Sequence, residues 1–222
     1  MLSHLDRIVF PDRCEVIEVV PSQRYVYPIF KNGHTSLLVA REKSKWPVRF
    51  NQQISKLKSI DVIIRDPGER LISGINTFIQ HTIRNQPDLD PATVGWFAQN
   101  YLYLDRHYCL QFSWLLNLAR YLNVDTQLNF LSMDAIGSIA LGFNEKPTGV
   151  ESVSSELMNQ IKQIKNNDMY QRIDTVLFKC IGQSMTFTQL LQHIKDSDPV
   201  AYEYVIGYAQ QILKPTYALS KT

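Results

Sequence analysis

Residues 24–43 read RYVYPIFKNGHTSLLVAREK, and they give the clearest indication of the fold class. Tyr, Val, Ile and Phe dominate residues 24–30, a composition that is typical of a β-strand. A loop around Gly33 follows, and the sequence then predicts a short helix over about residues 35–43. A strand that passes through a glycine loop into a helix is the first half of a βαβ unit.

The sequence on either side of this stretch completes the unit. Residues 14–20 form another β-rich run, which Pro21-Ser22 separates from the first strand, so we expect the two runs to pair as a hairpin. A polar and basic linker at residues 43–59 leads to the short apolar run 60–64, which is typical of a buried parallel strand.

A helix is predicted directly after this second core strand. Asp66 suits the N-cap, Pro67 suits the first helical position, and Glu69 completes a capping box. The helix should reach about residue 84 and turn its apolar stripe toward the sheet. The stripe consists of Leu71, Ile72, Ile75, Phe78 and Ile79.

Farther along the chain the pattern is mostly helical. One more core strand is expected at residues 127–131, and the last helix begins with Asp198 as N-cap and Pro199 at its first position. The predicted helices cover residues 91–103, 106–122, 156–165, 168–180 and 199–213.

These elements predict one α/β domain over residues 1–222, a three-layer sandwich with a short, mostly parallel sheet. Its nucleotide-binding core is expected at about residues 24–131, and a helical C-terminal part at about residues 152–222. A chain of 222 residues with 45% hydrophobic residues is long enough to bury one sizeable core.

Charge and cysteine content exclude several classes of protein. The 23 basic and 21 acidic residues give a net charge of +2, so we expect neither a nucleic acid nor a membrane surface as partner. Cys14, Cys109 and Cys180 lie far apart without CxxC spacing, which disfavours a disulfide framework and a zinc cluster. Reduced thiols and the lack of a signal peptide or long apolar run predict a cytoplasmic protein.

Residues 28–37, PIFKNGHTSL, have the residue types of an anion-binding loop. A helix that starts after a strand offers unpaired N–H groups and the positive end of its dipole. Gly33 permits close approach of the backbone, and Lys31 adds a positive charge. The hydroxyls of Thr35 and Ser36 are further donors. An ordinary βα turn with a solvated lysine has the same features, so the decapeptide alone leaves both interpretations open.

Residues 62–73, VIIRDPGERLIS, repeat this arrangement after the next strand. The guanidinium of Arg65 and the hydroxyl of Ser73 are suited to a second phosphate. The alternative is a surface ion pair of Arg65 with Asp66 or Glu69. Open α/β sheets bind ligands at the carboxyl ends of their strands, where both loops are expected. The Walker A pattern GxxxxGK[ST] is absent, which disfavours a nucleoside-triphosphate kinase.

Taken together, the two loops resemble the motifs of sulfotransferases that use 3′-phosphoadenosine-5′-phosphosulfate (PAPS). That family carries a 5′-phosphosulfate loop P-K-x-G-[ST]-[ST]-S-[LF] and a 3′-phosphate motif R-[DN]-P-x-x-R-x-x-S. The matching residues are Lys31, Gly33, Thr35, Ser36 and Leu37 in the first motif and Arg65, Asp66, Pro67, Arg70 and Ser73 in the second. Two departures occur in the first loop: Ile29-Phe30 separates Pro28 from Lys31, and His34 replaces a small residue.

The segment LDRHYCLQFSWL, residues 104–115, is similar to a histidine-aromatic-x-x-Gln segment of carbohydrate sulfotransferases. His107, Tyr108 and Gln111 occupy the matching positions. The whole resemblance covers about residues 25–131.

The resemblance implies a P-loop-like, nucleotide-binding sulfotransferase fold. It implies an enzyme that moves a sulfuryl group from PAPS to a hydroxyl or amine of a carbohydrate or small molecule. Adenosine 3′,5′-bisphosphate (PAP) would be the product, and no metal is expected. Lys31 would stabilise the leaving oxygen, while Arg65 and Ser73 would hold the 3′-phosphate. The 5′-phosphosulfate would be held by Lys31, Asn32, Gly33, His34, Thr35 and Ser36, whereas Arg70 is open to a role in folding.

Removal of the acceptor proton requires a general base. His107 is the first candidate because it shares a predicted helical face with Gln111 and Trp114. His81 and Glu42 are the alternatives, and a capping or core role for His107 is equally open.

Two other functions remain open for this fold class. A phosphoryl-transferring nucleotide-binding protein would need Mg²⁺ ligands, and an acidic residue that ends a strand is not obvious in the sequence. A catalytically inactive module could use the same fold as a scaffold.

Overall fold

The computed structural model describes residues 14–74, 77, 109–139 and 169–212. The predicted helices at 91–103 and 156–165 lie outside these ranges, as does the helix of residues 66–84 beyond residue 77. Residues 67–74 are helical, as the capping pattern at Asp66 predicts, and the Asp66 carboxylate accepts a hydrogen bond from the Glu69 amide at 2.9 Å.

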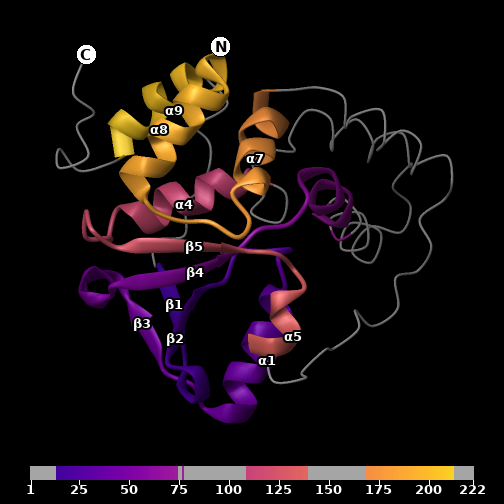
Figure 1. Cartoon of the computed structure of the whole chain (residues 1–222). Coiled ribbons are helices and arrows are strands. Elements are labelled where there is room, and N and C mark those ends of the chain that lie inside the picture. The colour runs from indigo at the N-terminus through magenta and orange to yellow at the C-terminus, as the bar shows by residue number, and fades with distance from the viewer. Residues whose placement is uncertain (1–13, 75–76, 78–108, 140–168, 213–222) are drawn as a thin grey trace, which may run out of the picture.

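The described elements build a mixed α/β fold around a six-stranded sheet (Figure 1). The strands lie in the order β3-β1-β2-β4-β5-β6. Their bounds are β1 Glu15–Val19, β2 Arg24–Tyr27, β3 Val48–Phe50, β4 Ser59–Ile63, β5 Gln127–Leu131 and β6 Ser184–Thr186. Strands β2, β4 and β5 are parallel neighbours, whereas β1, β3 and β6 pair antiparallel.

The prediction of a mostly parallel sheet is therefore wrong for the described strands, since three of their five pairings are antiparallel. The hairpin of β1 and β2 is confirmed by the pairing of Ile17 with Val26. β3 lies in the segment expected to be a linker, and β6 lies in the part expected to be helical. Both are three-residue strands whose sequences are too short to show a period, and both exist because a neighbouring strand supplies their hydrogen bonds.

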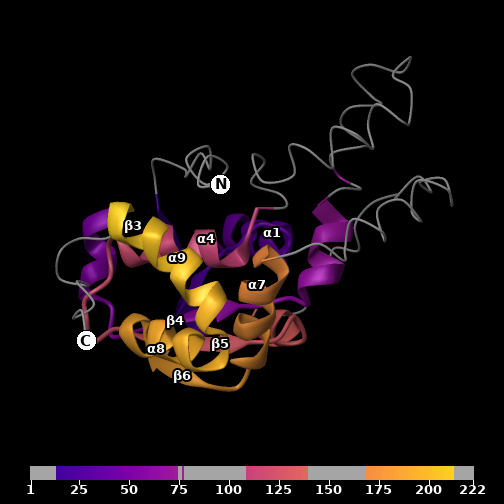
Figure 2. The same cartoon turned by 90° about the horizontal axis from the view of Figure 1, so that it is seen from above.

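Helices cover both faces of the sheet, so the three-layer arrangement is confirmed (Figure 1). α1 (His34–Ser44) and α5 (Ala135–Ile139) lie on one face. The other face carries α4 (Gln111–Ala119), α7 (Met169–Lys179), α8 (Phe187–Ser197) and α9 (Pro199–Ile212). The view in Figure 2 shows α7, α8 and α9 side by side over this face, and their residues contact one another. Two 3₁₀ turns, η2 (Val20–Ser22) and η3 (Asn51–Lys56), join strands.

Two hydrophobic clusters correspond to the two faces, and β4 contributes to both. Ile60 and Val62 belong to the cluster under α4, α7 and α8, whereas Ile63 belongs to the cluster under α1 and α5. Successive side chains of a strand point to opposite faces, which explains this division. All three side chains have no exposed surface, and burying each of them stabilises the fold by about 1.5–3 kcal/mol.

Local signals account for the helix ends. Thr186 accepts a hydrogen bond from the Gln189 amide at 3.2 Å, and Gln189 accepts one from the Thr186 amide, so α8 begins with a full capping box. The predicted start of this helix at 106 lies outside the described residues. Within them α4 begins at Gln111, since Cys109 forms a bend and Leu110, with φ −46° and ψ 138°, is not helical. α9 begins at Pro199 after Asp198, as predicted.

Candidate functional site

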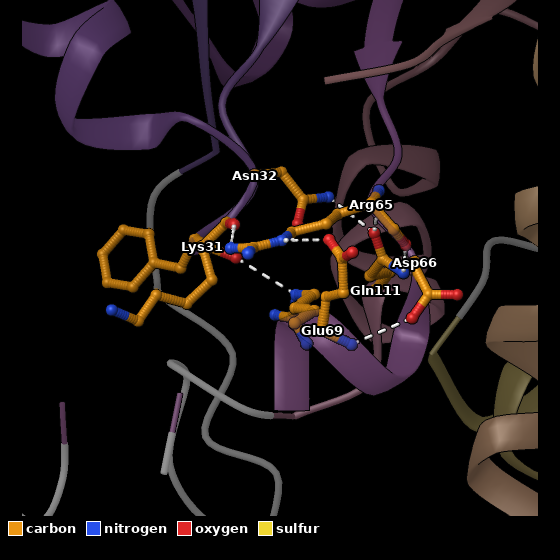
Figure 3. Close-up of polar contacts among 8 residues, drawn as sticks. Lys31, Asn32, Arg65, Asp66, Glu69 and Gln111 are labelled. Carbon is orange, nitrogen blue, oxygen red and sulfur yellow. Dashed lines mark hydrogen bonds and ion pairs between the residues drawn. The ribbon is translucent and has the colours of Figure 1, made fainter. Parts of the chain in front are cut away.

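Parallel pairing of β2 and β4 brings the two loops of the candidate site together. Val26 lies opposite Asp61 and Tyr27 opposite Val62, so the residues that follow each strand leave the sheet at the same edge. A direct contact joins them: Nη1 of Arg65 donates to the main-chain oxygen of Lys31 at 3.2 Å (Figure 3). The predicted convergence of the two loops is confirmed by this geometry.

Lys31 has a backbone conformation that is unusual for its residue type. Its φ of 68° lies in the left-handed region, which costs a side-chain-bearing residue about 1–2 kcal/mol. Its Nζ hydrogen-bonds to Oγ1 of Thr77, and this hydroxyl donates to the main-chain oxygen of Ser73 at 3.1 Å. The lysine of the first loop therefore reaches the helix of the second loop, beside the predicted ligand Ser73.

Gly33 is required at the start of α1 for two reasons. Its φ of 77° is left-handed, and a Cβ there would lie 1.8 Å from Cδ1 of Ile136 in α5. The glycine thus allows close packing of α5 as well as the turn itself. Gly33 is also the N-cap residue and offers no side-chain cap, so the first N–H groups of α1 lack an intrahelical partner. His34, Thr35 and Ser36 supply these N–H groups.

The side chain of His34 lies on an aromatic platform. Its ring centroid is 4.1 Å from that of Phe30, which in turn lies 4.9 Å from the ring of Trp114 in α4. His34 is half-buried, whereas Thr35 is exposed and Ser36 half-buried. His34, which differs from the sulfotransferase motif, is therefore packed against the ring of Phe30 in the same loop.

Asn32 directs its side chain into the protein and has no exposed surface. Its Nδ2 donates to the main-chain oxygen of Ile63 at 2.7 Å and to Oε1 of Gln111 at 2.6 Å (Figure 3). Only the main chain of Asn32 therefore remains for the anion-binding role that the sequence suggested.

Arg65 is partly exposed and is held by weak contacts. Its Nε lies 3.6 Å from Oε2 of Glu69, the surface pair that the sequence offered as an alternative. The Glu69 side chain is 68% exposed, and such pairs contribute about 0–1 kcal/mol. A phosphate oxygen could therefore replace the Glu69 carboxylate as the partner of Arg65 at little cost in free energy.

Arg70 of the second motif is buried and supports the fold. Its Nε donates to the main-chain oxygen of Phe30 at 3.1 Å, and its Nη1 donates to that of Cys109. Burial lowers the pKa of Arg70, while the nearby charge of Asp174 favours the protonated form. The guanidinium thus ties the first loop to the chain that enters α4, which is the folding role left open from the sequence.

Sequence analysis missed Asp174 in α7. Its carboxylate accepts hydrogen bonds from the amide of Gln111 at 2.8 Å and from that of Phe112 at 3.1 Å. Burial raises the pKa of Asp174, and the charge of Arg70 opposes this shift. Nothing in the surrounding sequence marks this aspartate, because its partners lie more than 60 positions away.

The described candidates at the sheet edge are the residues 31–36 together with Arg65 and Ser73. His107 and His81 lie outside the residues that the structure describes. Glu42 is exposed near the end of α1, and at 1.5 Å per residue it lies about 12 Å along the helix from His34. Glu42 is thereby separated from the loops that the helix N-terminus joins.

Two features are absent from the described residues. No group of three or more His, Cys, Asp or Glu side chains is placed to hold a metal ion within the described ranges. None of the helices described has the length and apolar character needed to cross a bilayer.

No protein-family model matches the chain, and comparison with curated proteins and with solved structures finds no significant match.

Proposed function

We propose that this protein is a sulfotransferase that moves a sulfuryl group from PAPS to an acceptor hydroxyl or amine on a carbohydrate or small molecule. One observation carries the proposal: two loops with the residues of the PAPS motifs lie at one sheet edge, with Arg65 hydrogen-bonded to the main chain of Lys31. The finer fold assignment, a P-loop-like sulfotransferase domain, rests on the same observation.

The residues of the first loop suit the 5′-phosphosulfate. The N–H groups at the start of α1 point outward along the helix axis, where a helix dipole favours an anion. Lys31 adds a cationic side chain in the same loop, with its Nζ hydrogen-bonded to Oγ1 of Thr77, and Thr35 and Ser36 add hydroxyl donors. No acidic residue occurs in the first turn of α1, so no side chain of that turn repels the anion.

The residues of the second loop suit the 3′-phosphate. Arg65 offers a planar set of donors, and its current carboxylate partner is solvent-exposed and easily exchanged. Ser73 lies on the following helix and is joined through Thr77 to Lys31. A nucleotide with phosphates at the 3′ and 5′ positions of its ribose would thus contact both loops.

The chemistry that these residues would perform is an in-line displacement at sulfur. The acceptor oxygen or nitrogen forms a bond to sulfur as the bond from sulfur to the 5′-phosphate oxygen breaks. Lys31 and the N–H groups of α1 stabilise the negative charge that develops on the departing phosphate. A base takes the proton of the acceptor, and His107 is the proposed residue for this step.

Thermal unfolding with different nucleotides tests the proposal. At a concentration of 100 times its Kd, PAP should stabilise the protein by about 2.7 kcal/mol, a shift of several degrees for a chain of this size. ADP, ATP and NAD should shift the midpoint much less at the same concentration, because they lack a 3′-phosphate. Equal shifts for all four nucleotides would remove the basis for a 3′-phosphate site, and Arg65→Ala should abolish the preference for PAP.

A further inference from the structure

Gln111 at the start of α4 bonds to both anion loops at once. Its Oε1 accepts hydrogen bonds from Nδ2 of Asn32 at 2.6 Å and from the amide of Arg65 at 3.0 Å. Its Nε2 donates to the main-chain oxygen of Arg65 at 2.9 Å (Figure 3). The carboxamide thus pairs with the Arg65 main chain as a neighbouring strand would, and it adds a bond to the first loop.

The position of Gln111 is itself set from a distant part of the chain. The carboxylate of Asp174 in α7 accepts hydrogen bonds from the amides of Gln111 and Phe112, the first two residues of α4. A carboxylate at this place satisfies N–H groups that a helix start leaves unpaired, and it interacts favourably with the helix dipole. Arg70, which bonds to the first loop and to Cys109, provides a compensating charge for Asp174.

Asn32, Gln111, Asp174 and Arg70 are all fully or almost fully buried, with at most 4% of their surface exposed. Hydrogen bonds between buried groups are costly to leave unmade, so such a network holds a single geometry. The bonds extend from Ile63 at the end of β4 through the two loops to α4 and α7. The separation between the Lys31 loop and the Arg65 loop is therefore set by side chains that would not touch a nucleotide.

We propose that Gln111 is a positioning residue that fixes the spacing of the two loops, so that the 5′ and 3′ groups of one nucleotide bind in a coupled way. This inference rests on the proposed function. Two phosphates on one ribose increase each other's affinity only if the distance between their two binding sites matches the distance between the phosphates. Loss of that distance weakens a ligand with both groups and leaves a ligand with one group nearly unaffected.

The hydrogen bonds from Gln111 to Asn32 and to the Arg65 main chain form a bridge between the two loops. Two substitutions break this bridge from opposite ends. Gln111→Met keeps the length of the side chain and removes its three hydrogen bonds, whereas Asn32→Ala removes the bond from the first loop to Gln111 together with the bond from Asn32 to the main-chain oxygen of Ile63. The matched control is Asn117→Leu, which removes a buried amide from the same helix. Asn117 has no exposed surface, and its Oδ1 accepts a hydrogen bond from Nη1 of Arg120 at 3.4 Å. The control thus reports the general effect of a polar-to-apolar change in the interior of α4.

Calorimetric titration then compares PAP with two probes that each carry one phosphate, 5′-AMP and 3′-AMP. We expect Gln111→Met and Asn32→Ala each to weaken PAP binding about tenfold or more and each single-phosphate probe by less than about threefold. Because both break one bridge, the double variant should lose little more than either single variant. Asn117→Leu should change none of the three affinities by more than about twofold.

Several outcomes would overturn the inference. Equal weakening of PAP and of one single-phosphate probe would show that Gln111 supports only that loop, and unchanged PAP affinity in both variants would show that the bridge has no effect on spacing. If Gln111→Met does not fold, Asn32→Ala decides the same question. Failure of the proposed function is recognised separately, since the unmodified protein would then bind PAP no more tightly than 3′-AMP.

Discussion

Lys31 combines backbone strain, a positive charge and a place between the two loops. Its φ of 68° is left-handed, a conformation that glycine adopts readily and that is unfavourable for lysine. Its carbonyl accepts from Arg65, and its amino group reaches Thr77. Strain of this kind is common at functional sites, because the surrounding contacts can hold a residue where it acts.

Substitutions at Lys31 and Arg65 separate catalysis from binding. Lys31→Ala should lower turnover about a hundredfold or more and weaken PAP binding much less, because the charge acts chiefly on the leaving oxygen. Arg65→Ala should instead weaken PAP binding about tenfold or more, since it removes the charge at the 3′-phosphate. Steady-state kinetics and PAP titration give both quantities.

Lys31→Gly serves as the control for the backbone. Lys31→Gly should lose as much turnover as Lys31→Ala. Its free energy of unfolding should be higher than that of Lys31→Ala by about 1 kcal/mol, because glycine relieves the left-handed strain. An Arg65→Ala variant with normal PAP affinity would contradict the assignment of the second loop.

Helix starts organise this protein at the level of elements. α1 begins without a side-chain cap and leaves its N–H groups to the candidate site, whereas α4 is capped by Asp174 from α7. α9 is capped by Asp198, whose Oδ1 accepts from the amide of Ala201 at 3.1 Å. α4 and α9 are thus capped by carboxylates and α8 by Thr186, whereas the helix at the predicted anion site has glycine as its N-cap.

Asp198 provides a test of capping with a defined pH dependence. Its carboxylate is paired with Arg172 by two bonds of 2.7 Å, and these bonds hold its pKa below the ordinary value of 3.8. A carboxyl group whose pKa is lower in the folded state adds stability above its unfolded pKa and loses it as the pH falls through its folded pKa. The contribution of the ionised Asp198 carboxylate to the free energy of unfolding should therefore be complete at pH 7 and decline below about pH 3.8.

Urea unfolding measures this contribution. Asp198→Asn keeps a capping side chain but loses the charge, so it should cost up to about 1 kcal/mol at pH 7, a small value because the Arg172 side chain is half exposed. Asp198→Ala also loses the cap and should cost about 1 kcal/mol more. A deficit of Asp198→Asn that stays the same from pH 7 to below pH 3.8 would show that the ion pair is not its source.

At the scale of the whole molecule, the residues of the candidate site lie at one edge of the sheet, and hydrophobic clusters lie on both of its faces. Strands β2 and β4 are central and parallel, so two βα loops share the edge, while β1, β3 and β6 extend the sheet with antiparallel pairings. Helices from the C-terminal half, above all α7, contact α4 and contribute Asp174 to the polar interior under the loops. Asn32 of the first loop and Asp174 of α7 are thereby both hydrogen-bonded to Gln111.

Positive charge in the candidate site comes from Lys31, Arg65 and the start of α1, so sulfuryl transfer should not depend on an added metal ion. We expect EDTA to leave the rate of transfer from PAPS within about twofold of the untreated rate. Loss of activity that Mg²⁺ restores would favour the phosphoryl-transferring alternative. Lys31→Ala assayed with and without EDTA is the control, since its loss of turnover should be the same in both conditions.

Local features could be predicted from the amino-acid sequence: the strand, glycine loop and helix of residues 24–43, the strand and capped helix around Asp66, and the cap at Asp198. These features depend on neighbours within a few positions, so the order of residue types is enough to predict them. Contacts between distant residues set the mixed strand order, the short strands β3 and β6, the inward direction of the Asn32 side chain, and the bridge from Gln111 to both loops. The bonds of that bridge join residues 46 to 79 positions apart, and they form only once particular strands and helices have become neighbours.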